Sequence, residues 1–256
     1  MARQLEAEGL VKTISAETVR RVLARNALKP WRWHHWLSAK VPRDAAFADA
    51  VTAVCDLYTR PLGAHEAVLC VDEKTSIQPR RRIARTRAAR AKSPVQVEQG
   101  YRRDGALNLF AALDTRSGRV IGWNSEQKRA DEFIAFLELL DATLAPHLSA
   151  IHVILDNLRV HKSKAVAAWL VSHPRFRFYF PPVHCSWLNQ VEQWFSILAR
   201  KALRIADFAD LRALDRHIHR FLAHWNARAH PFNWTTSSIT KIMAKCTADE
   251  AGHAAG

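Results

Sequence analysis

Residues 151–200 read IHVILDNLRVHKSKAVAAWLVSHPRFRFYFPPVHCSWLNQVEQWFSILAR, and this stretch decides the fold. It contains two β-rich runs, at residues 151–155 and 176–180, and the second ends at a pair of prolines. Short apolar runs bounded by turn residues are typical of buried strands. Segments with helical patterns follow the two runs, at residues 160–171 and 186–200. This alternation of strand and helix predicts an α/β fold.

Acidic residues end two predicted strands and begin one predicted helix. The apolar run at residues 67–71 ends at Asp72, and the run at 151–155 ends at Asp156. In such sheets, residues at the carboxyl ends of strands face the functional crevice. Glu192 lies roughly 40° from Leu188 on the helix, which predicts a carboxylate on the buried edge. Three converging carboxylates hold hard divalent cations through oxygen ligands, so the sequence predicts a cation site.

Each of these acids also has a common structural role. An aspartate directly after a strand is usually a turn residue or a cap. Glu192 is also placed to favour the N-terminus of its helix as a first-turn acid. The neighbouring Glu73 is expected to be solvated or to support the site. The set of three favours the cation site, because each acid takes a position that two-metal chemistry needs.

Three blocks of the sequence resemble the signature blocks of a bacterial transposase family, the IS-six-thirty family of the mariner superfamily. The blocks are residues 71–75 (VDEKT), residues 155–157 (LDN) with His161-Lys162-Ser163 behind them, and residues 182–192 (PVHCSWLNQVE). From Asp156 to Glu192 there are 192 − 156 = 36 positions, which is close to the spacing of that superfamily. The resemblance extends from about residue 14 to residue 234.

The resemblance implies an Asp-Asp-Glu catalytic domain on a ribonuclease-H-like fold, with a mixed sheet flanked by helices. It implies that Asp72 bridges two Mg²⁺ (or Mn²⁺) ions, while Asp156 and Glu192 each bind one of them. The implied reaction is hydrolysis at the transposon ends, followed by attack of the freed 3′-OH on target DNA. A homodimer on double-stranded DNA is the implied assembly. Further candidates for contacts to the ligands or to the substrate are Asn157, His161 and His184.

The charge of the chain points to a polyanionic partner. Lys plus Arg number 38 and Asp plus Glu 24, which gives a net charge of +14, and the isoelectric point is about 10.2. Nucleic acid fits this charge, although a membrane surface or a ribosome would attract it as well. Two basic segments stand out, a predicted helix capped by Ser15 and the stretch at residues 80–92. The arginines that we assign to DNA binding are Arg20, Arg21, Arg25, Arg80, Arg81, Arg82 and Arg85.

Each basic segment has two interpretations. The first resembles the recognition helix of a helix-turn-helix, and an amphipathic helix with a solvated basic face is the alternative. The second is expected to contact the DNA backbone, and a solvated loop is the alternative.

The chain is expected to divide into four parts. Residues 1–29 form a partial helix-turn-helix segment, residues 30–43 a linker rich in tryptophan, residues 44–235 the catalytic domain and residues 236–256 a tail. The family pattern has further helices before residue 14, so the N-terminal domain is expected to be truncated. An inactive DNA-binding remnant, or an inhibitor of transposition, is therefore the alternative to an active transposase. A nuclease that stops after hydrolysis is a second alternative.

The remaining catalytic-domain elements follow from periodicity and turn residues. Helices are predicted from residue 44 to 58, from 130 to 144, and up to residue 225 from a cap at Asp207 or Asp210. Strands at residues 107–113 and 119–123 flank a turn and predict a hairpin that pairs with the strand ending at Asp72.

Several other classes of protein are disfavoured. The four cysteines are widely spaced without a C-x-x-C pair, which argues against a disulfide framework and a cysteine zinc site. Cys55 and Cys70 have apolar neighbours and are expected in the core. No apolar run reaches about 18 residues and no signal peptide is present, so a cytoplasmic protein is expected. The family resemblance implies a bacterial protein associated with the nucleoid. A G-x-S-x-G motif and a P-loop are both absent from the sequence.

Overall fold

The chain divides into two compact units, Met1–Lys40 and Val41–Gly256, and each is taken by itself. The computed structural model describes residues 1–26, 45–102, 105–182, 185–204 and 207–235, together with residues 237 and 240. The predicted linker at residues 30–43 lies outside the described residues, as does most of the predicted tail at residues 236–256.

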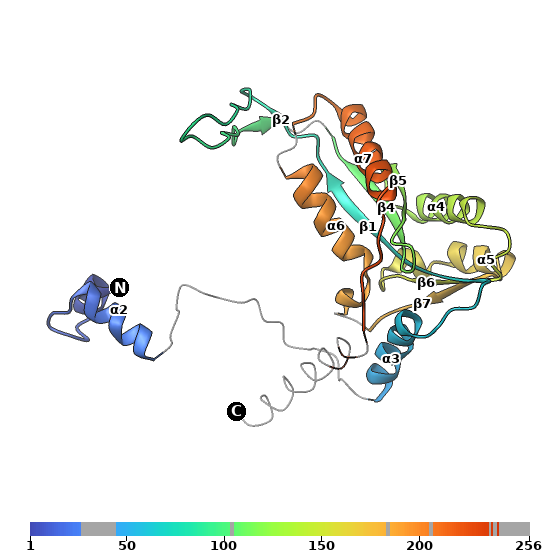
Figure 1. Ribbon diagram of the computed structural model, residues 1–256, viewed down its shortest axis with the longest axis horizontal. Coiled ribbons are helices and arrows are strands. Elements are labelled where there is room, and N and C mark those ends of the chain that lie inside the picture. Colours follow the sequence, from blue (N-terminus) through green and yellow to red (C-terminus); the bar gives the residue numbers. More distant parts are fainter. Residues whose placement is uncertain are drawn as a thin grey trace. The chain divides into compact units, whose positions relative to one another are not determined.

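The described part of the smaller unit, residues 1–26, contains two helices, α1 (Ala2–Ala7) and α2 (Ala16–Arg25) (Figure 1). The predicted cap of α2 is confirmed, because the Oγ atom of Ser15 accepts a hydrogen bond of 3.0 Å from the backbone N–H of Thr18. This bond satisfies one of the amides that a helix start leaves without an intrahelical partner. Val19 is the buried residue of α2, so most of this helix is accessible.

The larger unit is built around a mixed five-stranded sheet of order β5-β4-β1-β6-β7 (Figure 1). Its strands are β1 (Glu66–Ile77), β4 (Leu107–Asp114), β5 (Val120–Ser125), β6 (Ala150–Ile154) and β7 (Phe176–Tyr179). Strands β1, β4 and β5 are antiparallel neighbours, whereas β6 and β7 run parallel to β1. The predicted hairpin and both strands of the stretch at residues 151–200 are therefore confirmed.

Strand β1 is longer than predicted, and this changes the place of Asp72. The strand continues to Ile77, so Asp72 lies within it and not at its carboxyl end. The reason is pairing, because Glu73 and Lys74 remain opposite Phe110 and Leu109 of β4. A neighbouring strand thus satisfies the backbone where the sequence alone indicated a turn.

Helices cover both faces of the sheet. Helices α3 (Ala45–Thr59), α6 (Val191–Leu198) and α7 (Leu211–Asn226) share one apolar core with it, and α4 (Ala130–Thr143) and α5 (Lys164–Ser172) share the other (Figure 1). Val68 and Cys70 of β1 belong to the first core, and Leu69 and Val71 belong to the second. Side chains alternate along a strand, so Asp72 faces the α6 layer and Glu73 the opposite layer.

The predictions for α3, α4 and α7 are confirmed. Helix α4 buries Phe133, Phe136, Leu137 and Leu140, as its periodicity predicts. Asp210, one of the two candidate caps, begins α7 by accepting a hydrogen bond of 2.7 Å from the backbone N–H of Ala213. Cys55 and Cys70 are buried and free, as expected. Among the residues that the structure describes, no helix has the length and apolar character needed to cross a membrane.

Two helices that the sequence predicts as continuous are broken. Residues 160–171 divide into a 3-10 turn, η1 (Arg159–Lys162), and α5, because Ser163 caps the latter through the N–H of Val166. Residues 186–200 divide into the 3-10 turn η2 (Ser186–Leu188), α6 and the π-helical turn η3 (Ala199–Leu203). Between η2 and α6 the backbone of Asn189 is extended. Its side-chain amide donates a 2.9 Å hydrogen bond to the carbonyl of Val71, which ties this break to β1.

The basic stretch at residues 80–92 forms one side of an extended arm, not an irregular loop. The short strands β2 (Arg81–Arg82) and β3 (Tyr101–Arg102) pair at its base, and isolated bridges continue the pairing further out, joining Arg87 to Gln96 and Arg90 to Ser93. The arm projects away from the five-stranded sheet (Figure 1). The pairing holds a highly charged segment in an ordered shape that its composition did not predict.

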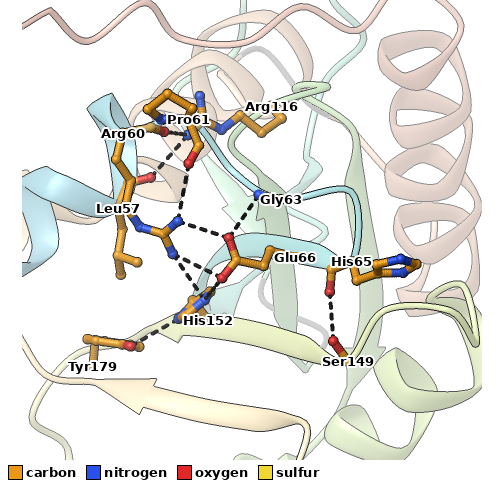
Figure 2. Close-up of polar contacts among 10 residues, drawn as sticks. All are labelled: Leu57, Arg60, Pro61, Gly63, His65, Glu66, Arg116, Ser149, His152 and Tyr179. Atoms are coloured by element: carbon orange, nitrogen blue, oxygen red, sulfur yellow. Dashed lines mark hydrogen bonds and ion pairs between the residues drawn. The ribbon is translucent and has the colours of Figure 1, made fainter.

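A polar cluster joins the start of β1 to the end of α3 (Figure 2). The Glu66 carboxylate accepts hydrogen bonds from the Arg60 guanidinium at 2.9 and 3.3 Å and from the N–H of Gly63 at 3.0 Å. Nε2 of the buried His152 lies 3.5 Å from the same carboxylate, and its Nδ1 lies 3.0 Å from the hydroxyl of Tyr179. The contacts of Arg60 lower the pKa of Glu66 to about 2, while burial lowers the pKa of His152.

Candidate active site

The three predicted carboxylates line one cavity, with a volume of about 370 Å³. Asp72 comes from β1, Asp156 follows the end of β6, and Glu192 lies in the first turn of α6. Elements distant in the sequence are adjacent here, because β1 lies beside β6 in the sheet and α6 packs against β1. The other residues that line the cavity are Asn157, Leu158, Pro181, Pro182, Cys185, Ser186 and Asn189.

Glu192 differs from the prediction in its burial. The sequence predicts it on the buried edge of its helix, but in the structure it is exposed. The apolar face of α6 is formed by Val191, Trp194, Phe195 and Leu198, which are all buried. Glu192 lies off this face while still lining the cavity, so its carboxylate is accessible to a ligand from solvent.

Asp72 carries an unfavourable buried charge. Its residue is only 9% exposed, and burial raises its pKa to about 7. The negative charges of Glu192, Glu73 and Asp156 raise this pKa further, against the hydrogen bond of 2.7 Å that the N–H of Glu73 donates to the Asp72 carboxylate. A carboxylate that is buried among like charges is one that a bound cation would stabilise.

His161 is buried between two other carboxylates. Its Nε2 donates to Oε1 of Glu73 at 2.9 Å, and its Nδ1 lies 3.0 Å from Oδ1 of Asp156. Burial alone would lower the pKa of His161, but the hydrogen bonds to Asp156 and Glu73 outweigh it and raise the pKa to about 10. The pKa of Asp156 is lowered overall. Burial acts to raise it, but the hydrogen bonds from His161 and from the N–H of Leu158 outweigh this effect.

The oxygen donors at the cavity suit a hard divalent cation. Three carboxylates line it, and Oδ1 of the buried Asn189 has no hydrogen-bond partner among the described residues. Mg²⁺ and Mn²⁺ prefer such carboxylate and carbonyl oxygens. Within the described ranges, no three Asp, Glu, His or Cys side chains already stand at positions that would hold one ion. The carboxylates must therefore approach one another to bind a cation, whose charge would offset their mutual repulsion.

The other predicted site residues have different surroundings. Asn157 lines the cavity, where its side chain donates to the carbonyl of Pro181 and accepts from the Lys162 ammonium. It thus links the segment after β6 to the segment after β7. His184 lies outside the described residues. Of the two roles that the sequence left open for Glu73, the structure favours support of the site, because its side chain is buried against His161. Sequence reasoning missed Asn189, although it stands within the block that contains Glu192.

The predicted DNA-binding arginines belong to separate regions. In α2, Arg20 forms an ion pair of 2.6 Å with Glu17, while Arg21 and Arg25 are exposed. Arg81, Arg82 and Arg85 belong to the arm and do not line the acidic cavity. The guanidinium groups of Arg80 and Arg82 lie over the ring of Tyr101 at 5.7 and 5.6 Å.

A second cavity, of about 410 Å³, is rich in cations. Arg80 lines it together with Lys74 of β1, Arg200 of η3 and Arg204. The remaining lining residues are Thr75, Ser76, Ile77, Gln78, Ala199 and Leu203, so its described lining contains no acid. Sequence reasoning missed Lys74, Arg200 and Arg204, because their distance along the chain hides their common location.

Comparison with known proteins places this site in a family context. Residues 67–215 match the family described as DDE superfamily endonuclease. An uncharacterized 39 kDa protein of insertion element IS630 from Shigella sonnei is 29% identical over 133 residues, which is 52% of this chain. The chain spans 36% of the length of that relative.

The fold is similar to that of transposase structures. The Mos1 transposase paired-end complex with left transposon end aligns with a TM-score of 0.54 at 16% identity, over 87% of this chain and 66% of that one. The mariner Mos1 paired end complex with Mg aligns with a TM-score of 0.55 at 14% identity, over 88% of this chain and 67% of that one. At such identities the likeness concerns the fold, and the predicted ribonuclease-H-like fold is confirmed.

Proposed function

Because the chain belongs to the DDE superfamily of endonucleases, we propose that it is a transposase that cleaves DNA at transposon ends. In the first step, water attacks the phosphodiester at the transposon end and releases a 3′-OH. In the second step, this 3′-OH attacks a phosphodiester of target DNA, so that one P–O bond forms as another breaks.

The observation that carries this proposal is the meeting of three carboxylates from β1, the end of β6 and α6 at one cavity. Asp72, Asp156 and Glu192 would hold two Mg²⁺ or Mn²⁺ ions there. When bound, such ions make water nucleophilic at neutral pH and stabilise the leaving oxygen. Asp72 supports this role because it is buried among like charges, and no cation among the described residues lowers its pKa.

Double-stranded DNA is the proposed partner. Lys74 lies on the same strand as Asp72, and Arg200 lies in η3, which directly follows the helix that carries Glu192, so the cation-lined cavity is built from β1 and from the continuation of α6. We assign Lys74, Arg80, Arg200 and Arg204 to contacts with DNA phosphates. Such contacts hold the duplex in register without reading its sequence. The helix α2, with Arg21 and Arg25 exposed, is assigned to the DNA-binding segment at residues 1–29.

The finer features of the function belong to the same proposal. The catalytic domain is assigned to residues 44–235, after a linker at residues 30–43 and before a tail at residues 236–256. A homodimer on paired DNA ends is the proposed assembly, and the bacterial cytoplasm, at the nucleoid, is the proposed location. Asn157 is assigned to keep the segments after β6 and β7 together at the cavity.

A cleavage assay tests the proposal directly. A labelled duplex that carries the end of the element encoding this chain is incubated with Mg²⁺ or Mn²⁺ and the full chain. We expect nicking at the element end by the wild type, loss of nicking in Glu192→Gln, and joined products when target DNA is added. DNA binding without any cleavage by the wild type would overturn the enzymatic proposal in favour of an inactive DNA-binding remnant, and cleavage without joining would indicate a nuclease.

A further inference from the structure

A buried histidine connects the strand of Asp72 to the carboxylate of Asp156. The side chain of His161 has no exposed surface, and its two ring nitrogens lie 2.9 Å from Glu73 and 3.0 Å from Asp156. The ring of Phe133 from α4 covers it, with a distance of 4.4 Å between the ring centroids. A ring that is enclosed and bonded at both nitrogens has one orientation, so it transmits the position of one carboxylate to the other.

Glu73 is linked to both aspartates, directly to Asp72 and through His161 to Asp156. Its backbone N–H donates a hydrogen bond of 2.7 Å to Oδ1 of Asp72, and its side chain, on the opposite face of β1, accepts from His161. The Glu73 side chain is itself only 5% exposed. One residue of the central strand therefore orients Asp72 directly and Asp156 through the imidazole.

Asp156 needs such support more than Asp72 does. Asp72 lies inside a strand that is paired on one side with β4, whereas Asp156 lies beyond the end of β6 with its side chain 36% exposed. Its Oδ1 accepts from His161 and from the N–H of Leu158 at 3.1 Å. Its Oδ2 has no hydrogen-bond partner among the described residues. One oxygen is thus held while the other remains available to a ligand.

We propose that His161 and Glu73 are positioning residues that orient the Asp156 carboxylate toward Asp72 for cation binding. This inference rests on the proposed function, because it concerns the same three-carboxylate site. Hydrogen-bond partners of metal ligands fix the orientation of those ligands, and their loss typically lowers metal affinity by about 10- to 100-fold. Neither residue touches the DNA or the reacting atoms in this proposal.

The test measures Mn²⁺ binding separately from cleavage. The full chain is bound to an end duplex that is already nicked, and Mn²⁺ is titrated while the free ion is followed by electron paramagnetic resonance. We expect His161→Ala and Glu73→Ala to weaken Mn²⁺ binding by about 10- to 100-fold. We expect Glu73→Gln to bind nearly as the wild type does, because its amide oxygen still accepts from Nε2 of His161. On intact duplex, nicking by the alanine variants should recover as Mn²⁺ approaches saturation.

A matched control separates positioning from general destabilisation. Val166 is buried in α5 and has no polar side-chain atom, so Val166→Ala should lower the melting temperature without altering Mn²⁺ affinity. The inference would be overturned if His161→Ala and Glu73→Ala bind Mn²⁺ as tightly as the wild type does while the wild type nicks DNA. That outcome would leave the proposed function intact. If His161→Ala does not fold, the Mn²⁺ affinities of Glu73→Ala and Glu73→Gln are compared instead, and equal affinities would overturn the inference. Absence of Mn²⁺ binding by the wild type would overturn both proposals.

Discussion

Two carboxylates on the same face of β1, Glu66 and Asp72, have opposite surroundings. Glu66 is bonded to Arg60 and to the N–H of Gly63, and its pKa falls to about 2 (Figure 2). Asp72 is buried near three other carboxylates, and its pKa rises to about 7. A carboxylate with a cationic side chain beside it is satisfied within the fold, whereas one among like charges is satisfied only by something that binds. The comparison separates a structural joint at one end of β1 from the proposed cation site further along the strand.

The largest expected effect is on the rate of DNA nicking, compared between variants of Asp72 and of Glu66. Asp72→Asn removes a proposed cation ligand and should reduce nicking by roughly 10³-fold or more, which corresponds to several kcal/mol of transition-state stabilisation. Glu66→Gln changes a carboxylate on the same strand face and should leave the nicking rate near that of the wild type. Single-turnover rates on a labelled end duplex measure both. Equal losses in the two variants would show that the two carboxylates do not differ in role.

The next effect concerns the stability of the metal-free chain. The folded pKa of Asp72, about 7, lies above the ordinary value of 3.8, so this group disfavours folding as pH rises above 3.8, with the full effect above pH 7. A shift of about three pKa units corresponds to at most about 4 kcal/mol. Asp72→Asn should therefore raise the melting temperature in EDTA at pH 8 by several degrees.

The stability gained by Asp72→Asn should depend on pH, which provides a control. At pH 5 the folded protein already holds Asp72 protonated, so the advantage of Asp72→Asn over the wild type should be smaller than at pH 8. Thermal unfolding followed by circular dichroism at both values measures this. A variant that is less stable than the wild type at pH 8 would show that hydrogen bonds of the carboxylate outweigh its buried charge.

A third effect concerns Arg200 and Arg204, which line the cavity whose described lining contains no acid. Replacing both Arg200 and Arg204 with alanine should reduce the slope of log K against log salt for DNA binding by about two, if each contacts a phosphate. The control pair is Arg212→Ala with Arg220→Ala, which removes the same charge from exposed positions of α7 outside this cavity. Fluorescence anisotropy at several salt concentrations compares them. Identical slopes for the two double variants would remove the cavity from the proposed DNA path.

The smallest effect is expected at the structural joint itself. Glu66→Gln should lower the melting temperature at pH 7, because the contacts with Arg60 favour the charged form of Glu66. The folded pKa of about 2 lies below the ordinary 4.5, so this contribution is complete above pH 4.5 and is lost as pH falls toward 2. The joint is partly exposed, which keeps the effect modest. Equal differences between variant and wild type at pH 7 and pH 3 would contradict this account.

Much of the fold could be predicted because its signals are local. Apolar periodicity identifies β6, β7 and α4, and turn residues identify the hairpin of β4 and β5. The predictions were wrong where residues distant in the sequence determine where a strand or helix ends. Strand β1 extends past Asp72 because β4 pairs with it, and the last predicted helix breaks at Asn189, whose side chain bonds to Val71. The exposure of Glu192 likewise depends on what α6 packs against.

The sequence by itself determined the three candidate acids, the two strands in or after which Asp72 and Asp156 lie, and the basic character of the chain, because residue type, spacing and periodicity are local properties. The tertiary structure alone decided which acids have partners. Arg60 stands beside Glu66, and His161, 88 positions along the chain from Glu73, joins it to Asp156. Contacts of this kind depend on how strands align and which face each side chain takes. A one-residue change of register would send Asp72 and Glu73 to each other's face, and no local pattern reports that choice.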